Sequence, residues 1–207
     1  MSFSNASTGD KPADPYKATN KQTDISLKDK VEDLVNFANK SKFGMMTTRD
    51  AKSGALVSRC MALAATENGG IDLLFHTNTE SHKTDEIDSD PHINIAFYNS
   101  SGDWASISGL SSVITDRALV KKHYSSALKA WLGDLGDGKH DGSENDPRIG
   151  VIRVKTVSAT YAISNSNVLG RVAQVAEGIV TGSPAQVNKL REISSQEIEQ
   201  YRSTASA

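Results

Sequence analysis

An arginine on an otherwise apolar strand face is the first feature that suggests chemistry. Arg59 lies within residues 55–66, whose composition predicts a strand. In a regular strand its side chain shares a face with those of Val57, Met61 and Leu63. A guanidinium on such a face is costly unless it meets an anion or lies at the rim of a barrel. Arg59 is therefore expected to bind an anionic ligand or, alternatively, a carboxylate elsewhere in the chain.

The turn after the next strand is a second candidate for anion binding. A strand over residues 71–77 ends shortly before a predicted short helix over residues 81–89. The free N–H groups at the start of this helix, the Ser81 hydroxyl and the Lys83 ammonium can converge on a phosphate. The alternative is a capped helix with an exposed lysine. Because Arg59 and this turn lie on consecutive strands, the two cations can face the same anion.

Other motifs give weaker signals. Residues 133–139 match a phosphate-binding loop, but His140 stands where a Mg²⁺-binding Ser or Thr is needed. The histidines lack the spacing of a zinc enzyme, so no metal site is expected. Cys60 has no neighbouring histidine in sequence and is expected to be a buried strand thiol. Trp104 and Trp131 can pack against a planar ring or, alternatively, in the core.

The composition narrows the class of protein. The chain has 207 residues, a net charge of −2 and one cysteine. The near-neutral charge argues against a general nucleic-acid binder or a protein of anionic membranes. The longest apolar run is far shorter than the roughly 20 residues of a membrane span, and the first residues do not resemble a secretory signal. We therefore expect a cytoplasmic protein without nucleic-acid or membrane partners.

Six strand-like segments must position these residues. Their mostly short connections favour a mainly β fold with flanking helices, an antiparallel barrel rather than a doubly wound sheet. Ser26 and Asp29 are expected to cap the first helix. Strands are predicted over residues 43–49, 55–66, 71–77, 92–99, 104–115 and 149–163, and helices over residues 26–42, 81–89, 116–132 and 184–202.

The same reasoning divides the chain into three parts. Residues 1–24 are rich in small polar residues and are predicted to form a disordered tail, because they cannot bury enough apolar surface. Residues 25–165 are predicted to form the barrel domain. Residues 166–207 are predicted to form a C-terminal extension with a helix.

The order of several motifs resembles that of FMN-binding split-barrel proteins. Within them, the chain is similar to the general-stress-protein branch of the pyridoxamine 5′-phosphate oxidase superfamily. It also resembles the blue-light-induced proteins of filamentous fungi through the segments GDLGDGKHDG, DPRIGVIRVKTVSATYA and REISSQEIEQYR. The resemblance covers residues 25–202. The shared motifs are Ser58–Met61, Leu74–Asn78 with Ser81–Lys83, Trp104–Gly109 and Lys129–Leu132.

The resemblance implies a fold, a cofactor and a set of site residues. It implies a six-stranded Greek-key split barrel that forms a homodimer, with FMN at the subunit interface. By position, Arg59 and Lys83 would bind the phosphate side of FMN, and Ser81 would donate a hydrogen bond. The remaining FMN-binding residues implied by position are Ser58, Met61, Phe75, Thr77, Trp104 and Trp131.

The implied activity is a flavin-dependent oxidoreductase that transfers a hydride or an electron, with a nicotinamide as a candidate donor. A non-catalytic FMN-binding sensor or interaction protein is the alternative. A pyridoxamine 5′-phosphate oxidase is less favoured, because the end of the chain lacks the Arg-x-His-Asp-Arg-like segment of those enzymes. His82 also departs from the family pattern and makes the charge of its turn depend on pH. No catalytic side chain is assigned.

Overall fold

The computed structural model of the protein describes residues 14–164 and 168–205. The chain divides into two compact units. The first comprises Met1–Ser41, Ala96–Ile107 and Val157–Ala207, and the second comprises Lys42–Ile95 and Ser108–Thr156. Arg59, Ser81 and Lys83 all belong to the second unit.

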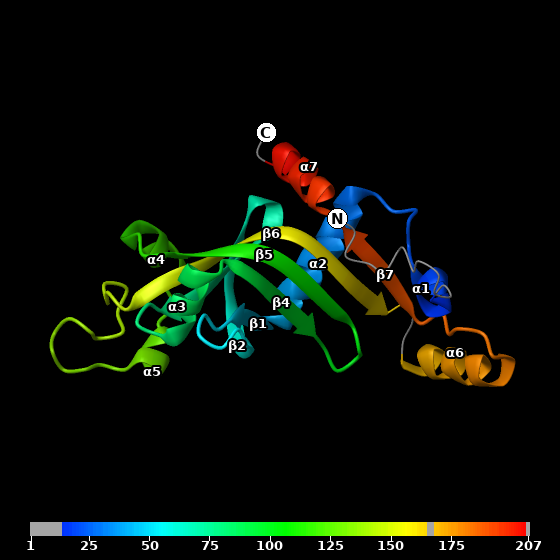
Figure 1. Ribbon diagram of the computed structural model, residues 1–207, viewed down its shortest axis with the longest axis horizontal. Coiled ribbons are helices and arrows are strands. Elements are labelled where there is room, and N and C mark those ends of the chain that lie inside the picture. Colours follow the sequence, from blue (N-terminus) through cyan, green and yellow to red (C-terminus); the bar gives the residue numbers. More distant parts are fainter. Residues whose placement is uncertain (1–13, 165–167, 206–207) are drawn as a thin grey trace. The chain divides into compact units, whose positions relative to one another are not determined.

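Six antiparallel strands form a closed barrel with flanking helices, which confirms the predicted fold. Hydrogen-bonded neighbours follow the order β3-β2-β1-β4-β5-β6, and pairing between β3 and β6 closes the ring (Figure 1). Each strand agrees with its predicted range to within one residue at either end. The strands are β1 (Phe43–Arg49), β2 (Leu56–Glu67), β3 (Asp72–Asn78), β4 (His92–Tyr98), β5 (Trp104–Ile114) and β6 (Ile149–Ser164).

Opposite the edge that pairs with β5, the strand β6 has two partners in succession. Its first part pairs with β3, from Ile149 opposite Asn78 to Val154 opposite Leu73. Its last part pairs with a further strand, β7 (Asn188–Ile193). At 16 residues, β6 is long enough to close the barrel and then continue into a second antiparallel pairing.

The core of the second unit surrounds β3. The first four residues of β3 are all buried, and the Phe75 side chain is fully shielded from water. Because consecutive side chains of a strand point to opposite faces, the run of buried residues shows that β3 is covered on both faces. One buried cluster of this core consists of Leu74, Val120, Ile149 and Val151.

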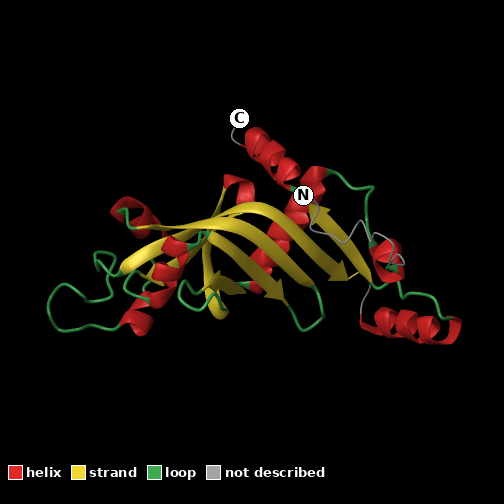
Figure 2. Cartoon of the chain, in the orientation of Figure 1, coloured by secondary structure: helices red, strands yellow, loops and turns green. Residues whose placement is uncertain are grey.

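The predicted helix over residues 116–132 is wrong in extent, because the chain forms two helices there. They are α4 (Arg117–His123) and α5 (Leu128–Leu132) (Figure 2). Asp116 caps the first helix as expected, and its carboxylate accepts from the Leu119 N–H at 2.9 Å. Tyr124 then leaves the helical conformation, with a ψ of 141°, and its hydroxyl donates to the Gly142 carbonyl. The two serines that follow are weak helix formers, which favours the break.

The helix α2 (Leu27–Ser41) belongs to the first unit and begins as predicted. Ser26 Oγ accepts from the Asp29 N–H at 3.1 Å and donates to the Asp29 carboxylate at 2.7 Å. The buried residues of α2 recur at helical spacing, and they are Val31, Leu34, Phe37 and Ala38.

The predicted helix over residues 184–202 is also wrong in extent. Residues 188–193 form β7 instead, and a helix, α7, occupies Ser195–Ala205. Pairing with β6 overrides the local helical preference, and Arg191 and Ile193 alternate into the buried face of the pair.

Two further helices were not predicted from the sequence. They are α1 (Pro15–Asn20) and α6 (Val168–Thr181). The Asp14 carboxylate caps α1, within the segment that was predicted to be disordered. Residues 1–13 of that segment lie outside the described residues. Among the described helices, none combines the length and the apolar composition that crossing a membrane requires.

Replacing Tyr161 with Phe should destabilise the protein by about 1–2 kcal/mol, because a buried hydrogen bond is lost. The Tyr161 hydroxyl donates to the Lys30 carbonyl at 2.7 Å, and the residue is fully buried. Urea unfolding measures the difference. The control is Tyr98→Phe, at a residue that is 69% exposed, with an expected loss below about 0.5 kcal/mol. Equal losses in the two variants would contradict this account of Tyr161.

Candidate functional site

The pairing of β1 with β2 fixes the direction of the Arg59 side chain. Arg59 is opposite Met46, and Val57 is opposite Thr48. Residues that face each other across an antiparallel pair point to the same side of the sheet. Met46 and Thr48 are both buried, so Arg59 lies on the inner face as predicted, with its side chain 24% exposed.

A carboxylate from the helix α3 (His82–Ser89) meets this guanidinium. Arg59 Nη2 donates to Glu86 Oε1 at 3.2 Å, and Arg59 Nη1 lies 2.9 Å from Glu86 Oε2. Arg59 Nη1 also donates to Thr48 Oγ1 at 2.7 Å, and the Thr48 hydroxyl donates to Glu86 Oε2. The carboxylate that the sequence analysis left as an alternative partner for Arg59 is therefore Glu86.

Glu86 is ionised in this setting although its side chain is only 1% exposed. Burial alone would raise the pKa of its carboxyl group. The hydrogen bonds from Arg59 and Thr48, with the charge of Arg59, outweigh burial and lower the pKa. Sequence reasoning missed Glu86. The available signal was its position four residues after His82 on the predicted helix, which places both on one helical face.

The second cation lies at the start of α3. Lys83 Nζ donates to Ser81 Oγ at 2.6 Å, and Ser81 Oγ donates to the Asn78 carbonyl at 2.6 Å. Burial lowers the pKa of the Lys83 ammonium, and the nearby charge of Arg59 lowers it further. Arg59 bonds Glu86 of the same helix, so both cations are associated with α3. The Ser81 proton is directed to a backbone carbonyl here, so Ser81 orients Lys83.

His82 adds a titratable group beside this pair of cations. Its Nε2 lies 3.0 Å from Asp50 Oδ2 and 3.8 Å from Glu86 Oε1, and its Nδ1 lies 3.6 Å from Asp85 Oδ2. The hydrogen bond to Asp50 raises the pKa of the imidazole, and the charge of Glu86 adds to this effect. Asp50 is held in turn by the Ser53 N–H and hydroxyl, which lower the pKa of its carboxyl group.

Asp50, His82 and Glu86 also have the composition of a metal site, which the sequence analysis did not anticipate. Their candidate ligand atoms all lie within 4.8 Å of one another. Each carboxylate already has a protein cation as its partner, because Asp50 pairs with His82 and Glu86 pairs with Arg59. We therefore interpret the cluster as a network of ion pairs.

The other predicted residues are spread over several environments. Met61 is opposite Gly44 and lies on the same face as Arg59, whereas Ser58 points to the other face and bonds Thr47 at 2.8 Å. Phe75 and Thr77 are buried in β3. Trp131 is 86% exposed on α5, so it is not a core residue, and Trp104, in the first unit, is 38% exposed.

The outer face of the β1–β2 pair is partly apolar and open. Cys60 is exposed there, which corrects the expectation of a buried thiol. The reason is that β2 contains no buried residue, although it is a strand of the barrel. Phe43 and Leu56, at the ends of these strands, are 58% and 69% exposed.

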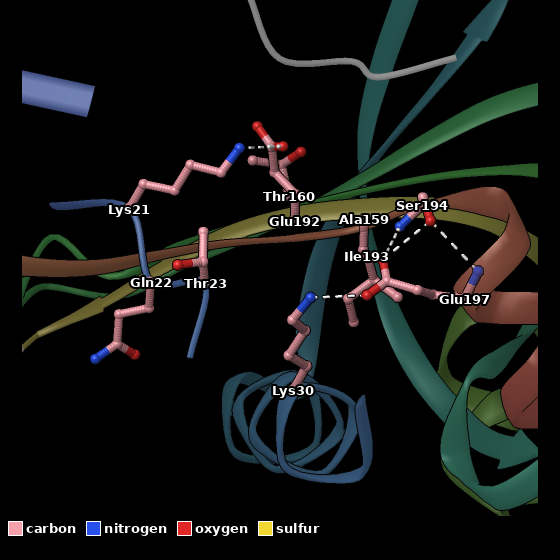
Figure 3. Close-up of a pocket in the computed structure, with 10 residues that line it drawn as sticks. All are labelled: Lys21, Gln22, Thr23, Lys30, Ala159, Thr160, Glu192, Ile193, Ser194 and Glu197. Atoms are coloured by element: carbon pink, nitrogen blue, oxygen red, sulfur yellow. Dashed lines mark hydrogen bonds and ion pairs between the residues drawn. The ribbon is translucent and has the colours of Figure 1, made fainter. Parts of the chain in front are cut away.

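A cavity of about 300 Å³ lies within the first unit and is lined by none of the predicted site residues (Figure 3). Its charged groups are already paired. Lys30 Nζ donates to Glu197 Oε1 at 2.7 Å, and Lys21 Nζ lies 3.4 Å from Glu192 Oε2. These pairs tie α2 and the segment before it to α7 and β7, which gives the charges a structural role.

Comparison with known proteins places the chain in a family. Residues 29–186 match the family described as "Pyridoxamine 5'-phosphate oxidase like". The chain belongs to the pyridoxamine 5′-phosphate oxidase-like family. It is 66% identical to Protein bli-3 of Neurospora crassa over 203 residues, which cover 98% of this chain and 97% of that protein. The resemblance to this family that the motifs predicted is thereby confirmed.

Solved structures share the fold of this family member. A putative general stress protein 26 from Jannaschia sp. CCS1 has a TM-score of 0.60 and 15% identity, and the match covers 82% of this chain and 99% of that one. A general stress FMN/FAD binding protein from Xanthomonas citri has a TM-score of 0.55 and 20% identity, covering 68% of this chain and 93% of that one. At such identities the likeness shows the fold alone.

His82 should titrate above the ordinary histidine value of 6.5, and His76, which is partly buried, should titrate below it. Protonated His82 gains its carboxylate partner only in the folded chain. Its contribution to stability is therefore complete below 6.5 and is lost as the pH rises through the folded pKa. Imidazole proton shifts in NMR spectra measure both values.

The Asp50→Asn variant should bring the pKa of His82 down, because the main hydrogen-bond partner loses its charge. Asp88→Asn, at an exposed residue of the same helix, is the matched control. A His82 titration that is unchanged in Asp50→Asn would show that the ion pair does not hold in solution.

Proposed function

We propose that this protein binds FMN through its phosphate and acts as an FMN-dependent oxidoreductase. The observation that carries the proposal is that the Arg59 guanidinium bonds Glu86 on α3, the helix that also carries Lys83, so that two cations gather in the second unit. Repulsion between like charges is unfavourable, and a bound dianion relieves it. The description of the Xanthomonas citri protein as FMN/FAD binding supports FMN as that anion.

The residues present fit the phosphate of FMN. Arg59 uses Nη1 and Nη2 for Glu86 and Thr48, and among the described residues no hydrogen bond comes from its Nε. One edge of the guanidinium therefore remains for an anion, in the planar geometry that suits phosphate oxygens. Lys83 uses one ammonium proton for Ser81 and keeps two.

The proposed site extends from the phosphate subsite towards the flavin ring. Ser81 holds Lys83, and Met61 lies on the same strand face as Arg59. Trp131, on α5 of the same unit, is an exposed aromatic residue available for contact with a flat ring, and Trp104 is assigned by position alone. The other residues assigned to the site by position are Ser58, Phe75 and Thr77.

Bound FMN would supply the hydride or electron transfer, with a nicotinamide as the proposed donor. The chain itself supplies two fixed cations that hold the phosphate. Because Glu86 neutralises part of this charge, the subsite keeps a small positive excess that suits one phosphate group.

We also propose that the protein is a cytoplasmic homodimer with FMN at the subunit interface. The exposed apolar residues Phe43 and Leu56 and the exposed Cys60 on the β1–β2 face support a second copy of the chain as partner. The single unpaired cysteine suits a reducing compartment.

Removing both cations tests the phosphate assignment. The Arg59→Ala, Lys83→Ala double variant should lose the flavin absorbance that copurifies with the wild type. Each lost charge-assisted hydrogen bond costs about 1.5–3 kcal/mol, so the combined loss should exceed 100-fold in affinity. The control is Lys122→Ala with Lys155→Ala, which changes the net charge equally at two exposed residues. Flavin retained in the site variant, or lost equally in the control, would refute the assignment.

Anaerobic mixing with NADH or NADPH tests the oxidoreductase activity. Bleaching of the visible absorbance of the bound flavin is the expected result. Flavin that stays oxidised with both donors would contradict the nicotinamide-dependent activity and favour a non-catalytic FMN-binding protein. Light scattering on the same sample should give twice the chain mass of 22.2 kDa.

A further inference from the structure

We propose that Thr48 and Glu86 are positioning residues of the phosphate subsite, which hold the Arg59 guanidinium with its Nε edge free for the anion. This inference rests on the proposed FMN binding and assigns a role to two residues that do not themselves contact the ligand. It explains why a cation needed for binding is already engaged by a carboxylate.

The bonds to Arg59 come from two directions. Thr48 Oγ1, on β1, accepts from Nη1 at 2.7 Å, and Glu86 Oε1, on α3, accepts from Nη2 at 3.2 Å. Two acceptors on different elements fix both the position and the plane of a guanidinium. Both engage the terminal nitrogens, so the fork formed by Nε–H and an adjacent terminal N–H still points away from them.

The two acceptors are themselves rigidly held. Thr48 is 1% exposed, and its hydroxyl donates to Glu86 Oε2. Glu86 is equally buried and lies three residues after Lys83 on the same helix. The helix α3 therefore carries both the second cation and the anchor of the first, so one rigid element sets the separation of Arg59 and Lys83.

Holding the side chain in advance lowers the entropy that binding must overcome. An arginine side chain loses rotamer freedom worth up to about 2 kcal/mol when it is ordered. The bonds to Thr48 and Glu86 order Arg59 before the ligand arrives, and such preorganisation raises affinity.

A competing interpretation predicts the opposite change in FMN affinity. Glu86 would then be an internal competitor that occupies the guanidinium, and loosening the network would release Arg59 and tighten FMN binding. A variant that changes no charge separates the two interpretations, because removing Glu86 itself would alter both position and electrostatics.

The test is the Thr48→Val variant, which removes one hydroxyl and leaves every charge in place. Its dissociation constant for FMN should rise about tenfold, which corresponds to about 1.4 kcal/mol, the size of one hydrogen bond to a charged group. Its constant for riboflavin, which lacks the phosphate, should be unchanged. Thr48→Ser restores the hydroxyl and should restore FMN affinity. Flavin fluorescence titration measures the dissociation constants of FMN and riboflavin for the wild type and for each variant.

Thr156→Val is the matched control, because Thr156 is a buried threonine of the same unit whose hydroxyl donates to the Ile71 carbonyl at 2.5 Å. It should lower stability without changing the ratio of FMN to riboflavin affinity. Glu86→Asp keeps the charge but retracts the carboxylate, and it should weaken FMN binding as Thr48→Val does. It serves as the test if Thr48→Val does not fold.

Two outcomes would overturn the inference, and a third would refute the proposed function on which it rests. Equal weakening for FMN and riboflavin in Thr48→Val would mean a purely structural role for Thr48. Unchanged or tighter FMN binding would mean that the network does not position Arg59 for the phosphate. A wild type that binds FMN no better than riboflavin would instead refute the phosphate subsite itself, which distinguishes failure of the proposed function from failure of this inference.

Discussion

The buried carboxylate of Glu86 is the constraint on which the arrangement of the site depends. An ionised group that is almost entirely shielded from water is tolerated only when a cation and hydrogen-bond donors surround it. Arg59 and Thr48 meet that requirement from two paired strands, while Glu86 comes from the helix that follows β3. The bonds that Glu86 requires therefore fix α3 against β1 and β2. The position of Lys83 follows from the same requirement, because it lies on that helix.

The balance of charges around this carboxylate is uneven. In the second unit, Arg59 pairs with Glu86 and His82 pairs with Asp50. Lys83 lies on the helix that carries His82 and Glu86. Both acids pair with a cation, whereas among the described residues Lys83 Nζ donates a hydrogen bond to the Ser81 hydroxyl. Burial, and after it the charge of Arg59, lower the pKa of Lys83, so both effects disfavour its charged form in the folded chain. Functional sites commonly contain such unrelieved interactions, since a ligand gains affinity by relieving them.

The sequence was sufficient to predict the features that depend on local pattern. Alternating strands and short connections predicted the barrel, and the inner face of β2 on which Arg59 lies also followed from the strand pattern. Features that depend on distant partners were missed. Residues 188–193 carry a helix-compatible pattern, and only pairing with β6 makes them a strand. Glu86 likewise has the sequence context of a surface residue on a short helix, and only the folded barrel shows that it is buried.

One edge of β6 pairs first with β3 and then with β7, and this has a consequence for the end of the chain. The last part of this strand, from Ala159 to Ser164, obtains its backbone partners from β7. Without β7 that part would present a bare sheet edge, and bare edges recruit strands from other molecules and promote aggregation. The C-terminal segment thus acts as a protective cover for the barrel strand. Truncating the chain before residue 188 would remove α7 and would also expose an unpaired strand edge that promotes aggregation.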